Sequence, residues 1–580
     1  MAKRWRIHPH DPDRIAALSR SAGISGLVAQ LLICRGITDP KDAKVFLEPK
    51  LTALRDPELL PGCADAARKI HAAIADKKRI TVYGDYDVDG MTGTAVLVLC
   101  LKLLGADARY YIPNRIDEGY GLNSEAIRAK AAEGTNLMIT VDCGIGSVEE
   151  VAVAREAGME LIITDHHEPG NRLPQAEVIV HPRLPGNDYP FGGLSGSGVA
   201  LKLAWALCQQ ADGAKKVGRR MKDFLMQAVG LASMGTVADA VPLVDENRVL
   251  VCHGLRSLSQ YPTLGISTLI KVAQLHGKGK LDSEDIGYVI GPRLNAAGRL
   301  GQPQLGVELL VTDKPDRARE LAEYIDELNA NRQTLERSIQ RTANKQVKDL
   351  FNPAEDAALV LADRGWHPGV IGIVAGRLAE KYHRPVVMIS WDQVGIKPGV
   401  GSARSVPGFN LHAALTACDE FLLGHGGHVA AAGLQIEESR IDAFRTAFCE
   451  VAAREISEEE RVARLAIDAE APLSAFTLET VCQIERLEPF GQGNPRPVLC
   501  ASGVTLANPP RTMGKEGHHL DLRLSQHGIV LRAVAFGGGD WADDLAEAGT
   551  IDVAFRPKIN VFGGRQSVQL HLEDWQPTEV

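Results

Sequence analysis

Short apolar runs alternate with longer helical runs in the part of the chain that begins near residue 79. The strand-like runs are RITVYG (79–84), ADARYYIP (106–113), NLMITVD (136–142) and MELIITD (159–165). The first helical run between them is TAVLVLCLKLLG (94–105). Alternating strands and helices predict a parallel, doubly wound α/β sheet, in which ligands bind beyond the carboxyl ends of the strands. The acidic motifs GDYDVDG, VDCG and TDHH each begin where a predicted strand stops. We therefore expect the three motifs to lie at one edge of the sheet.

The pattern changes after this sheet. Residues 190–310 have a mostly helical pattern, and a long helix is expected next, with Asp313 as its N-cap and Pro315 in its first turn. Its apolar stripe recurs at three-, four- and seven-residue spacing and consists of Leu321, Ile325, Leu328, Leu335 and Ile339. A second α/β pattern follows this helix, from about residue 353 to residue 462. Short alternating runs with glycine-rich turns then favour a small antiparallel barrel, with an OB-fold as the leading hypothesis.

The length of the chain requires several packed units. A chain of 580 residues is too long for one hydrophobic core. We predict an α/β multidomain protein with five parts. They are an N-terminal segment (1–50), a doubly wound catalytic domain (51–312), a connector helix (313–352), a second α/β domain (353–462) and a C-terminal β-barrel domain (463–580).

Composition narrows the class of protein. The formal net charge of −9 argues against a protein that coats DNA through surplus positive charge. Ten cysteines occur without a CxxC pair or a His/Cys cluster at zinc spacing, which favours neither a disulfide framework nor a structural zinc site. No signal peptide or membrane span is expected from the apolar runs. We expect a cytoplasmic, monomeric protein with reduced thiols.

The run Asp85-Tyr-Asp87-Val-Asp89-Gly90 resembles the first half of an EF-hand loop. That interpretation fails, because the position of the bidentate glutamate is Val96 and the run follows a strand. Three carboxylates on one turn repel each other unless a cation neutralises them. Divalent metal binding is the hypothesis, and a solvated acidic turn is the alternative.

Further candidate ligands follow the other strands. Asp142 ends one apolar run and Asp165-His166-His167 ends another, whereas Asp239 lies late in a helical segment. Taken singly, a strand-end aspartate could be a helix cap, and a histidine could be a hydrogen-bonded polar residue. Asp239 could lie at an exposed helix end. Together with the first motif they offer enough carboxylate and imidazole ligands for two metals. This ligand set suits Mn²⁺, with Mg²⁺ as a more weakly bound alternative.

In this order, GDYDVDG, VDCG, TDHH and GTVADAVPL resemble the DHH phosphoesterase superfamily, and within it the RecJ family. The supporting matches are PNRIDEGYGLN (113–123), GPRLNAAGRLG (291–301), GSARS (401–405), GHGGHVAAAG (424–433) and EPFGQGNPRPV (488–498). The resemblance covers nearly all of the chain from about residue 50. It implies that the second α/β domain is DHHA1-like.

The resemblance also implies roles for the acidic and histidine residues. Those expected around the two metals are Asp87, Asp89, Asp142, His166, His167 and Asp239. Asp85 is expected in the same acidic site and Asp165 behind it, orienting His166. Some members of the superfamily have a histidine ligand at the position of Tyr83, and that ligand is absent here.

Substrate contacts are implied for a further group of residues. Arg115, Ser402 and Arg404 match a pocket for a terminal 5′ phosphate, which an arginine fork suits. Arg293 and Arg299 are candidates for the same kind of contact, and His425 and His428 are candidate phosphate donors. Without the resemblance, GSARS would be interpreted as an ordinary polar loop, and the arginines as members of surface ion pairs. GHGGHVAAAG would be interpreted as a tight turn packed into a helix.

The function implied is 5′ to 3′ exonuclease hydrolysis of single-stranded DNA to 5′-mononucleotides, in recombination and repair. The implied partners are single-stranded DNA, a single-strand-binding protein and a RecQ-like helicase. Alternatives are a DHH phosphodiesterase for short oligonucleotides or cyclic dinucleotides, and a noncatalytic DNA-binding replication scaffold. Residues 503–580 of the barrel have seven Lys/Arg against ten Asp/Glu, so DNA binding there requires a local groove. Phe555 and Phe562 are possible stacking faces, although we interpret both as core residues.

Overall fold

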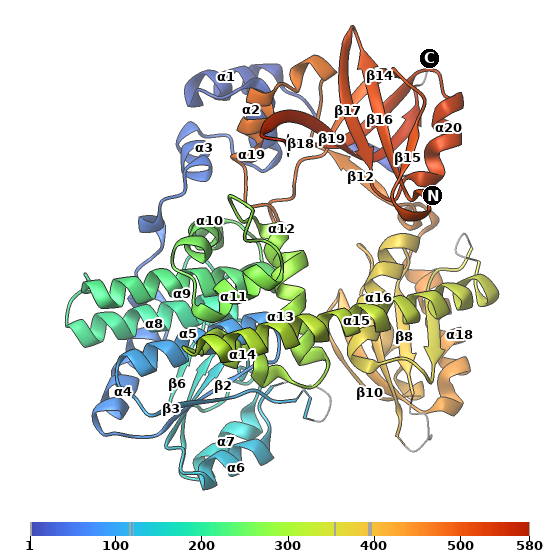
Figure 1. Ribbon diagram of the computed structural model, residues 1–580. Helices are drawn as coiled ribbons and strands as arrows, with labels where there is room; N and C mark the ends of the chain where they lie inside the picture. The colour runs from blue at the N-terminus through green and yellow to red at the C-terminus, as the bar shows by residue number, and fades with distance from the viewer. Residues whose placement is uncertain (1–2, 115–117, 120, 353–354, 392–396, 579–580) are drawn as a thin grey trace. The chain divides into compact units, whose positions relative to one another are not determined.

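The structure is a computed structural model that describes residues 3–114, 118–119, 121–352, 355–391 and 397–578 (Figure 1). The chain forms two compact units. One consists of Leu51–Arg461, and the other combines Met1–Lys50 with Val462–Val580. The short strand β1 (Arg4–Ile7) explains this combination, because it pairs in parallel with β12 (Arg464–Ile467).

The larger unit begins with the predicted parallel sheet, whose strand order is β3-β2-β4-β5-β6. The strands are β2 (Ile80–Gly84), β3 (Ala108–Tyr111), β4 (Leu137–Val141), β5 (Glu160–Thr164) and β6 (Val178–Val180). All four strand pairs are parallel. Because β2 and β4 are buried along their whole length, both faces of the sheet are covered, as the doubly wound fold requires.

Two hydrophobic clusters lie on opposite faces of this sheet. Val82, Ile139 and Ile162 belong to the cluster under α4 (Cys63–Ala75), α5 (Val88–Leu103), α8 (Gly196–Asp212) and α9 (Arg219–Ala238). Met138 and Leu161 face the smaller cluster under α6 (Ser124–Ala132) and α7 (Val148–Glu156). Helices lie on both sides of the sheet (Figure 1). Alternate strand residues pack against these opposite layers, which confirms the predicted fold class.

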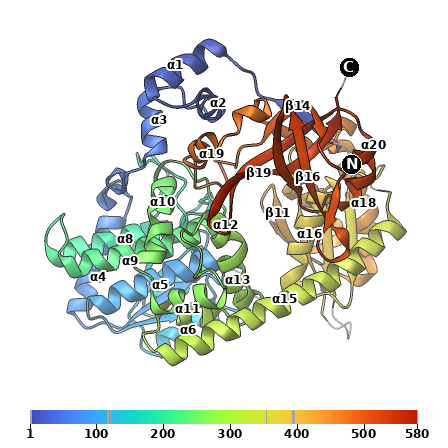
Figure 2. The ribbon, with the colours of Figure 1, turned by 45° about the horizontal axis from the view of Figure 1, so that its top comes forward.

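The predicted long helix is α15 (Pro315–Leu350). It packs against α11 (Leu264–Val272), α13 (Gly291–Arg299) and α14 (Pro303–Val311) near its start, and against α16 (Pro368–Tyr382) further along (Figures 1 and 2). Two details of the prediction were wrong. The N-cap position is Lys314 and not Asp313, and Leu335 is 36% exposed, whereas the other four residues of the predicted stripe are buried.

A second sheet follows α15, with strand order β10-β11-β9-β8-β7. Its strands are β7 (Leu359–Asp363), β8 (Val386–Ser390), β9 (Gly399–Arg404), β10 (Leu422–Gly427) and β11 (Ala431–Ile436). The motif GHGGHVAAAG forms the β10–β11 hairpin, so the alternative of a turn packed into a helix was wrong. The helices of this domain include α16, α17 (Leu411–Thr416) and α18 (Ile441–Glu455).

The smaller unit contains a closed barrel. Its strands are β14 (Leu499–Leu506), β15 (Arg511–Met513), β16 (His519–Gln526), β17 (Ile529–Ala535), β18 (Ile551–Phe562) and β19 (Arg565–Pro577). β14 pairs with both β16 and β18, and β17 pairs in parallel with β19. Helix α20 (Ala542–Glu547) connects the third barrel strand to the fourth. This arrangement confirms the predicted OB-fold.

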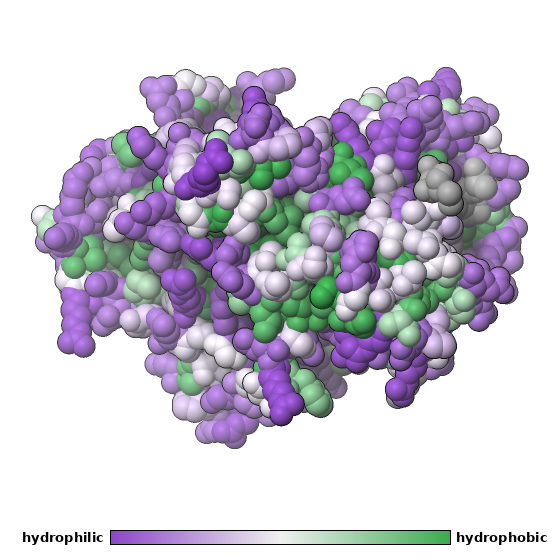
Figure 3. Space-filling model, turned by 90° about the horizontal axis from the view of Figure 1, so that it is seen from above, coloured by the Kyte–Doolittle hydropathy of each residue, from purple (hydrophilic) through white to green (hydrophobic). Residues whose placement is uncertain are grey.

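The helices α1 (Pro12–Ala22), α2 (Gly26–Cys34), α3 (Pro40–Leu47) and α19 (Leu478–Glu485) complete the smaller unit. Among the described residues, no single helix has the length and apolar character to cross a membrane. Only α1 and α2 counted together, across a 109° bend, reach that threshold. On the face in Figure 3, hydrophilic side chains predominate and hydrophobic patches lie between them.

A buried ion-pair network connects α15 to α16. Glu336 contacts Arg332 of its own helix at 2.6 Å and Arg377 of α16 at 2.5 Å, and both Glu336 and Arg332 are buried. Asn329 accepts a hydrogen bond from Arg332. The network lies where the core of the first sheet ends along α15, at Leu328, and before the core of the second sheet begins, at Ile339.

We predict that Glu336→Ala lowers the free energy of unfolding by about 3 kcal/mol, because it leaves the buried Arg332 guanidinium without a carboxylate. Urea denaturation followed by circular dichroism measures the change. Glu327→Ala, on the exposed side of the same helix, is the matched control and should shift stability by less than about 0.5 kcal/mol. Equal stability of the two variants would show that the network contributes nothing.

Candidate metal centre and active site

Three aspartates follow three neighbouring parallel strands. Asp85 comes after β2, Asp142 after β4 and Asp165 after β5. The carboxyl ends of parallel strands meet at one edge, which brings the three residues together as the sequence predicted. Asp142 has a φ of 64°, a left-handed conformation that is strained for an aspartate. The surrounding fold must therefore offset the free-energy cost of this backbone conformation.

The start of α5 places two further carboxylates. Asp87 is the N-cap, and its Oδ1 accepts hydrogen bonds from the backbone N–H groups of Asp89 (2.9 Å) and Gly90 (3.0 Å). The carboxylate of Asp89 accepts from Gly196 N–H (2.6 Å) and Ser197 N–H (3.0 Å), at the start of α8. Two helix N-termini thus supply partial positive charge to this acidic turn.

Gly196 is required by close packing against the acidic residues. A Cβ atom at this position would lie 2.5 Å from Asp142 Oδ1 and 2.6 Å from Asp142 Cβ. Sequence analysis did not identify Gly196 as part of the site. The only sequence signal was its place in the glycine-rich stretch GLSGSGVALK, which is also typical of an ordinary helix start.

The histidine pair follows β5. Asp165 Oδ1 lies 2.7 Å from His167 Nδ1 and accepts the backbone N–H groups of His166 (2.7 Å) and His167 (3.1 Å). The expectation that Asp165 orients His166 therefore holds only for the His166 backbone, because the imidazole that it contacts is that of His167. Asp165 Oδ2 accepts the backbone N–H of Ile145 (2.9 Å).

The pKa values of the two histidines shift in opposite directions. Burial alone would raise the pKa of Asp165, but the hydrogen bond and charge of His167 outweigh it and lower that pKa to about 2. Burial likewise opposes protonation of His167, yet Asp165 raises the pKa of His167 above its ordinary value. Burial lowers the pKa of His166 to about 4. His166 is therefore a neutral imidazole, the form that binds metals.

The neutral ring of His166 faces carboxylates. Its Nε2 lies 3.1 Å from Asp142 Oδ1, 3.5 Å from Asp239 Oδ2 and 3.9 Å from Asp89 Oδ2. This buried Nε2 has no hydrogen-bond partner among the described residues. A neutral imidazole nitrogen beside three acidic oxygens requires a shared proton or a cation between them, so the geometry fits a metal ion.

Three groups of ligand atoms lie close enough together to hold metal ions, each within 4.8 Å. They are Asp142/His166/His167, Asp89/His166/Asp239 and Asp85/Asp87/Asp142. Between them the groups contain all seven residues that the sequence suggested as ligands. Asp142 and His166 are each shared by two groups, as expected of residues that lie between two neighbouring cations.

The carboxylates also raise one another's pKa. Burial is the largest cause for Asp87, Asp142 and Asp239, and repulsion from the neighbouring aspartates adds to it. The pKa of Asp239, which caps the C-terminal end of α9, rises to about 9. Without cations these groups therefore bind protons, and cations would replace those protons.

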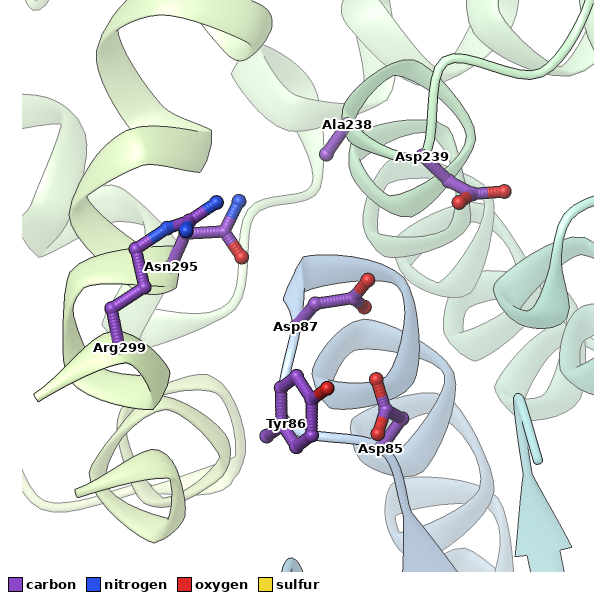
Figure 4. A pocket seen from close by; sticks show the side chains of 7 residues that line it. All are labelled: Asp85, Tyr86, Asp87, Ala238, Asp239, Asn295 and Arg299. Carbon is purple, nitrogen blue, oxygen red and sulfur yellow. The ribbon is translucent and has the colours of Figure 1, made fainter. Parts of the chain in front are cut away.

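A cavity of about 270 Å³ opens beside the acidic residues (Figure 4). Asp85, Asp87 and Asp239 lie on one side, while Asn295 and Arg299 reach in from α13. Asn295 Oδ1 also accepts the backbone N–H of Val88 (3.2 Å), which holds the start of α5. Sequence analysis missed Asn295 and the cavity-lining Tyr86, although both lie inside motifs that it singled out.

The arginines of GPRLNAAGRLG have different environments. Arg293 Nε lies 2.8 Å from Asp326 of α15, and its Nη1 donates to Val289 O. Arg299 lines the cavity and donates to Gly369 O (3.1 Å), in the first turn of α16. Arg299 is therefore the arginine of this motif that lies beside the acidic site.

The residues suggested for the 5′ phosphate converge on α16. Ser402 and Arg404 lie on β9, and the space beside Gly372 of α16 is bounded by Ser402 Oγ and Arg404 Nη2. Arg404 Nη1 also donates to Ser402 Oγ (3.3 Å). Arg299, Ser402 and Arg404 thus surround the first two turns of one helix. Arg115 lies outside the described residues.

The remaining candidates lie elsewhere. His425 lies on β10, 3.5 Å from Asp419 and edge-to-face with His412 at a ring distance of 5.5 Å, and His428 is exposed beyond the end of that strand. Tyr83 donates its hydroxyl to Gly121 O (3.1 Å) and packs against Tyr111 at 5.4 Å. Its hydroxyl is therefore engaged with the backbone of another segment.

Three family models match successive parts of the chain. The DHH family N-terminal domain matches residues 79–230, the DHHA1 domain matches 355–454 and the RecJ OB domain matches 467–574. The first match includes all of the seven suggested metal ligands except Asp239.

Relatives that match this chain over nearly all of its length are described as single-stranded-DNA-specific exonuclease RecJ. The Bacillus subtilis protein is 36% identical over 98% of this chain and 70% of its own length, and the Haemophilus influenzae protein is 34% identical over 95% and 96%. The crystal structure of RecJ from Thermus thermophilus with Mn²⁺ matches with a TM-score of 0.84 at 32% identity, covering 100% of this chain and 80% of that one. The same protein with Mg²⁺ matches with a TM-score of 0.78 at 30% identity, covering 100% and 79%.

We predict that Mn²⁺ binding releases protons and strengthens as the pH rises from about 6 to about 9, because metals compete with protons for carboxylates of raised pKa, including Asp239 at about 9. Calorimetric titration in two buffers of different ionisation enthalpy measures the release. Identical enthalpies in both buffers, together with a flat affinity profile, would contradict this prediction.

Gly196→Ala should weaken Mn²⁺ binding by about 10- to 100-fold, because the added methyl group displaces the Asp142 carboxylate. Gly198→Ala is the matched control. A Cβ there meets its nearest atom at 3.5 Å, an ordinary contact, so binding should be unchanged. Calorimetry on both variants tests the difference, and wild-type affinity in Gly196→Ala would disprove the clash.

Proposed function

Because the chain belongs to the RecJ family, we propose that it degrades single-stranded DNA from the 5′ end by hydrolysing phosphodiester bonds to release 5′-mononucleotides. One observation carries the proposal. Seven carboxylate and imidazole side chains meet at the edge of the first sheet in three overlapping ligand groups, beside an open cavity. No hydrophobic core needs such a set, since the residues repel one another.

Asp85, Asp87, Asp89, Asp142, His166, His167 and Asp239 would hold two divalent cations, Mn²⁺ or Mg²⁺. When bound, the cations neutralise the charge of the phosphodiester and activate water for attack. The protein itself supplies positioning. Asp165 orients the His167 ring, while the amides of α5 and α8 hold Asp87 and Asp89.

We infer the 5′ to 3′ direction of the reaction from the positively charged side chains beside the cavity. Arg299 lines the cavity and contacts α16, beside which Ser402 and Arg404 lie. Guanidinium groups suit a terminal phosphate, which carries more negative charge than an internal diester. These residues would bind the 5′ phosphate so that the first diester reaches the cations. Arg293, His425 and His428 would contact the strand further away.

Two other functions are compatible with parts of the site. A DHH phosphodiesterase for short oligonucleotides or cyclic dinucleotides would use the same ligands, but it has no need of the OB-fold barrel. A noncatalytic DNA-binding replication scaffold would retain the barrel, but it has no need of seven clustered ligands. The combination of barrel and ligand cluster favours the exonuclease.

The cellular setting is also part of the proposal. We propose a cytoplasmic, monomeric enzyme in recombination and repair that acts beside a single-strand-binding protein and a RecQ-like helicase. We also propose five parts of the chain: the N-terminal segment (1–50), the catalytic domain (51–312), the connector helix (313–352), the second α/β domain (353–462) and the barrel domain (463–580).

With Mn²⁺, the protein should release mononucleotides from 5′-phosphorylated single-stranded DNA and leave a blunt duplex and a cyclic dinucleotide intact. Asp142→Ala and His166→Ala should each lower the rate by more than about 100-fold through loss of metal ligands. Asp316→Ala, at the exposed start of α15, is the control and should retain full activity.

Two outcomes would contradict the proposal. One is unchanged activity of both ligand variants. The other is equal degradation of a duplex whose only single-stranded tail is at the 3′ end. Preferred hydrolysis of the cyclic dinucleotide would favour the phosphodiesterase alternative.

A further inference from the structure

Strand β6 ends at the same edge of the first sheet as the strands that precede the suggested metal ligands. It pairs with β5, so His181, the residue after β6, lies beside Asp165, the residue after β5. His181 is fully buried, and it is in none of the three ligand groups found among the described residues. A buried imidazole needs partners for both of its ring nitrogens, and these partners show what His181 does.

Both ring nitrogens of His181 bind the backbone. Nδ1 accepts the N–H of Arg183 (2.9 Å), so in the neutral ring the proton is on Nε2. Nε2 lies 2.8 Å from the carbonyl oxygen of His167 and donates to it. The only ring N–H of His181 is therefore used on the backbone of a suggested metal ligand.

Arg183 binds the neighbouring carbonyl group. Its Nη2 donates to His166 O, and its Nη1 contacts Glu168. Gly192 leaves room for this side chain, because a Cβ there would lie 2.8 Å from Arg183 Cγ. The two residues that flank Pro182 thus hold the two consecutive carbonyl groups of the histidine pair.

Side chains therefore bind all four backbone polar groups of His166 and His167. Asp165 Oδ1 accepts the two N–H groups, at 2.7 and 3.1 Å, while Arg183 and His181 donate to the two carbonyl oxygens. Strand hydrogen bonds cannot fix this segment, because it lies beyond the end of β5. The three side chains set its backbone conformation, and that conformation limits the directions in which both imidazoles can point.

His181 is itself held by another segment. Its backbone N–H donates to Pro61 O (3.4 Å), in the turn before α4. The same turn packs closely on β6, because a Cβ at Gly62 would lie 2.0 Å from Ile179 O. The end of β6 is therefore a closely packed support for the histidine pair.

We propose that His181 is a positioning residue for the metal centre: through His167 O, it holds the histidine pair in the conformation in which the imidazoles bind a cation. His181 touches neither cation nor substrate in this role. The proposal rests on the proposed function, because that function assigns two divalent cations to the site. It deepens that function by naming a residue outside the ligand set on which one of the cations depends.

The role of His181 implies a selective effect on the two cations. His166 and His167 lie in two of the ligand groups, whereas the group Asp85/Asp87/Asp142 contains no imidazole. Disturbing the histidine pair should therefore weaken binding of one cation and spare the other. Loss of a group that orients a metal ligand lowers metal affinity by about ten-fold or more.

Two amide substitutions separate the two hydrogen bonds of His181. The longer side chain of glutamine places its amide near the position of Nε2 and can still donate to His167 O. The shorter side chain of asparagine places its amide near the position of Nδ1, where it can bind only the N–H of Arg183. Because both variants put an amide into the same buried space, they are matched for polarity.

The test measures Mn²⁺ binding to the full-length protein without DNA, from the electron paramagnetic resonance signal of the free ion. His181→Asn and His181→Ala should each bind one of two Mn²⁺ ions about ten-fold more weakly, whereas His181→Gln should stay within about three-fold of the wild type. His276→Ala, at an exposed histidine of the same unit, is the control and should bind both ions as the wild type does.

Hydrolysis of single-stranded DNA gives a second measurement. In His181→Asn, the Mn²⁺ concentration for half-maximal rate should rise about ten-fold, while the rate at saturating Mn²⁺ stays within about two-fold of the wild type. A merely structural role would lower the folded fraction, and with it the maximal rate, without changing the dependence on Mn²⁺.

Two outcomes would overturn the role of His181. One is wild-type Mn²⁺ affinity in all three His181 variants, and the other is equal weakening in His181→Gln and His181→Asn. The proposed function fails separately: a wild type that binds two Mn²⁺ ions but does not hydrolyse single-stranded DNA refutes the nuclease alone. Wild-type hydrolysis with unchanged Mn²⁺ affinity in His181→Asn refutes the positioning role alone.

Discussion

The repulsion among carboxylates at the edge of the first sheet is the constraint on which the rest of the structure depends. Burial and mutual repulsion raise the pKa of Asp87, Asp142 and Asp239. Such a cluster is stable only with protons or cations bound to it. The fold therefore has to hold acidic groups near one another and still leave room between them for cations.

The surrounding elements satisfy this requirement without neutralising the cluster. Backbone amides of α5 and α8 bind individual carboxylates, which orients them and leaves their negative charge available. Gly196 leaves space for Asp142, and Asn295 ties the start of α5 to α13. Since these supports come from three helices, α5, α8 and α13, the metal centre depends on the packing of the whole domain.

Positive charge is local in this protein. The chain as a whole is acidic, with a formal net charge of −9, which keeps nonspecific attraction to nucleic acid weak. Arginines are instead grouped locally, beside α16 in the larger unit and at directly opposite positions of β16 and β17 in the smaller one. In the proposed function, contact with DNA depends on the placement of a few guanidinium groups and not on total charge.

The sequence by itself determined the fold class, the existence of the long helix and the strand ends after which six of the seven suggested ligands follow, whereas Asp239 ends a helix. These features depend on local periodicity and on the rule that parallel strands end at one edge. Only the tertiary structure showed that Asp165 contacts the His167 ring, and that Phe555 is core as interpreted whereas the same interpretation was wrong for Phe562, which is 82% exposed. The reason is physical. Periodicity shows which face of an element is buried, but contacts between distant segments are decided by how those faces pack together.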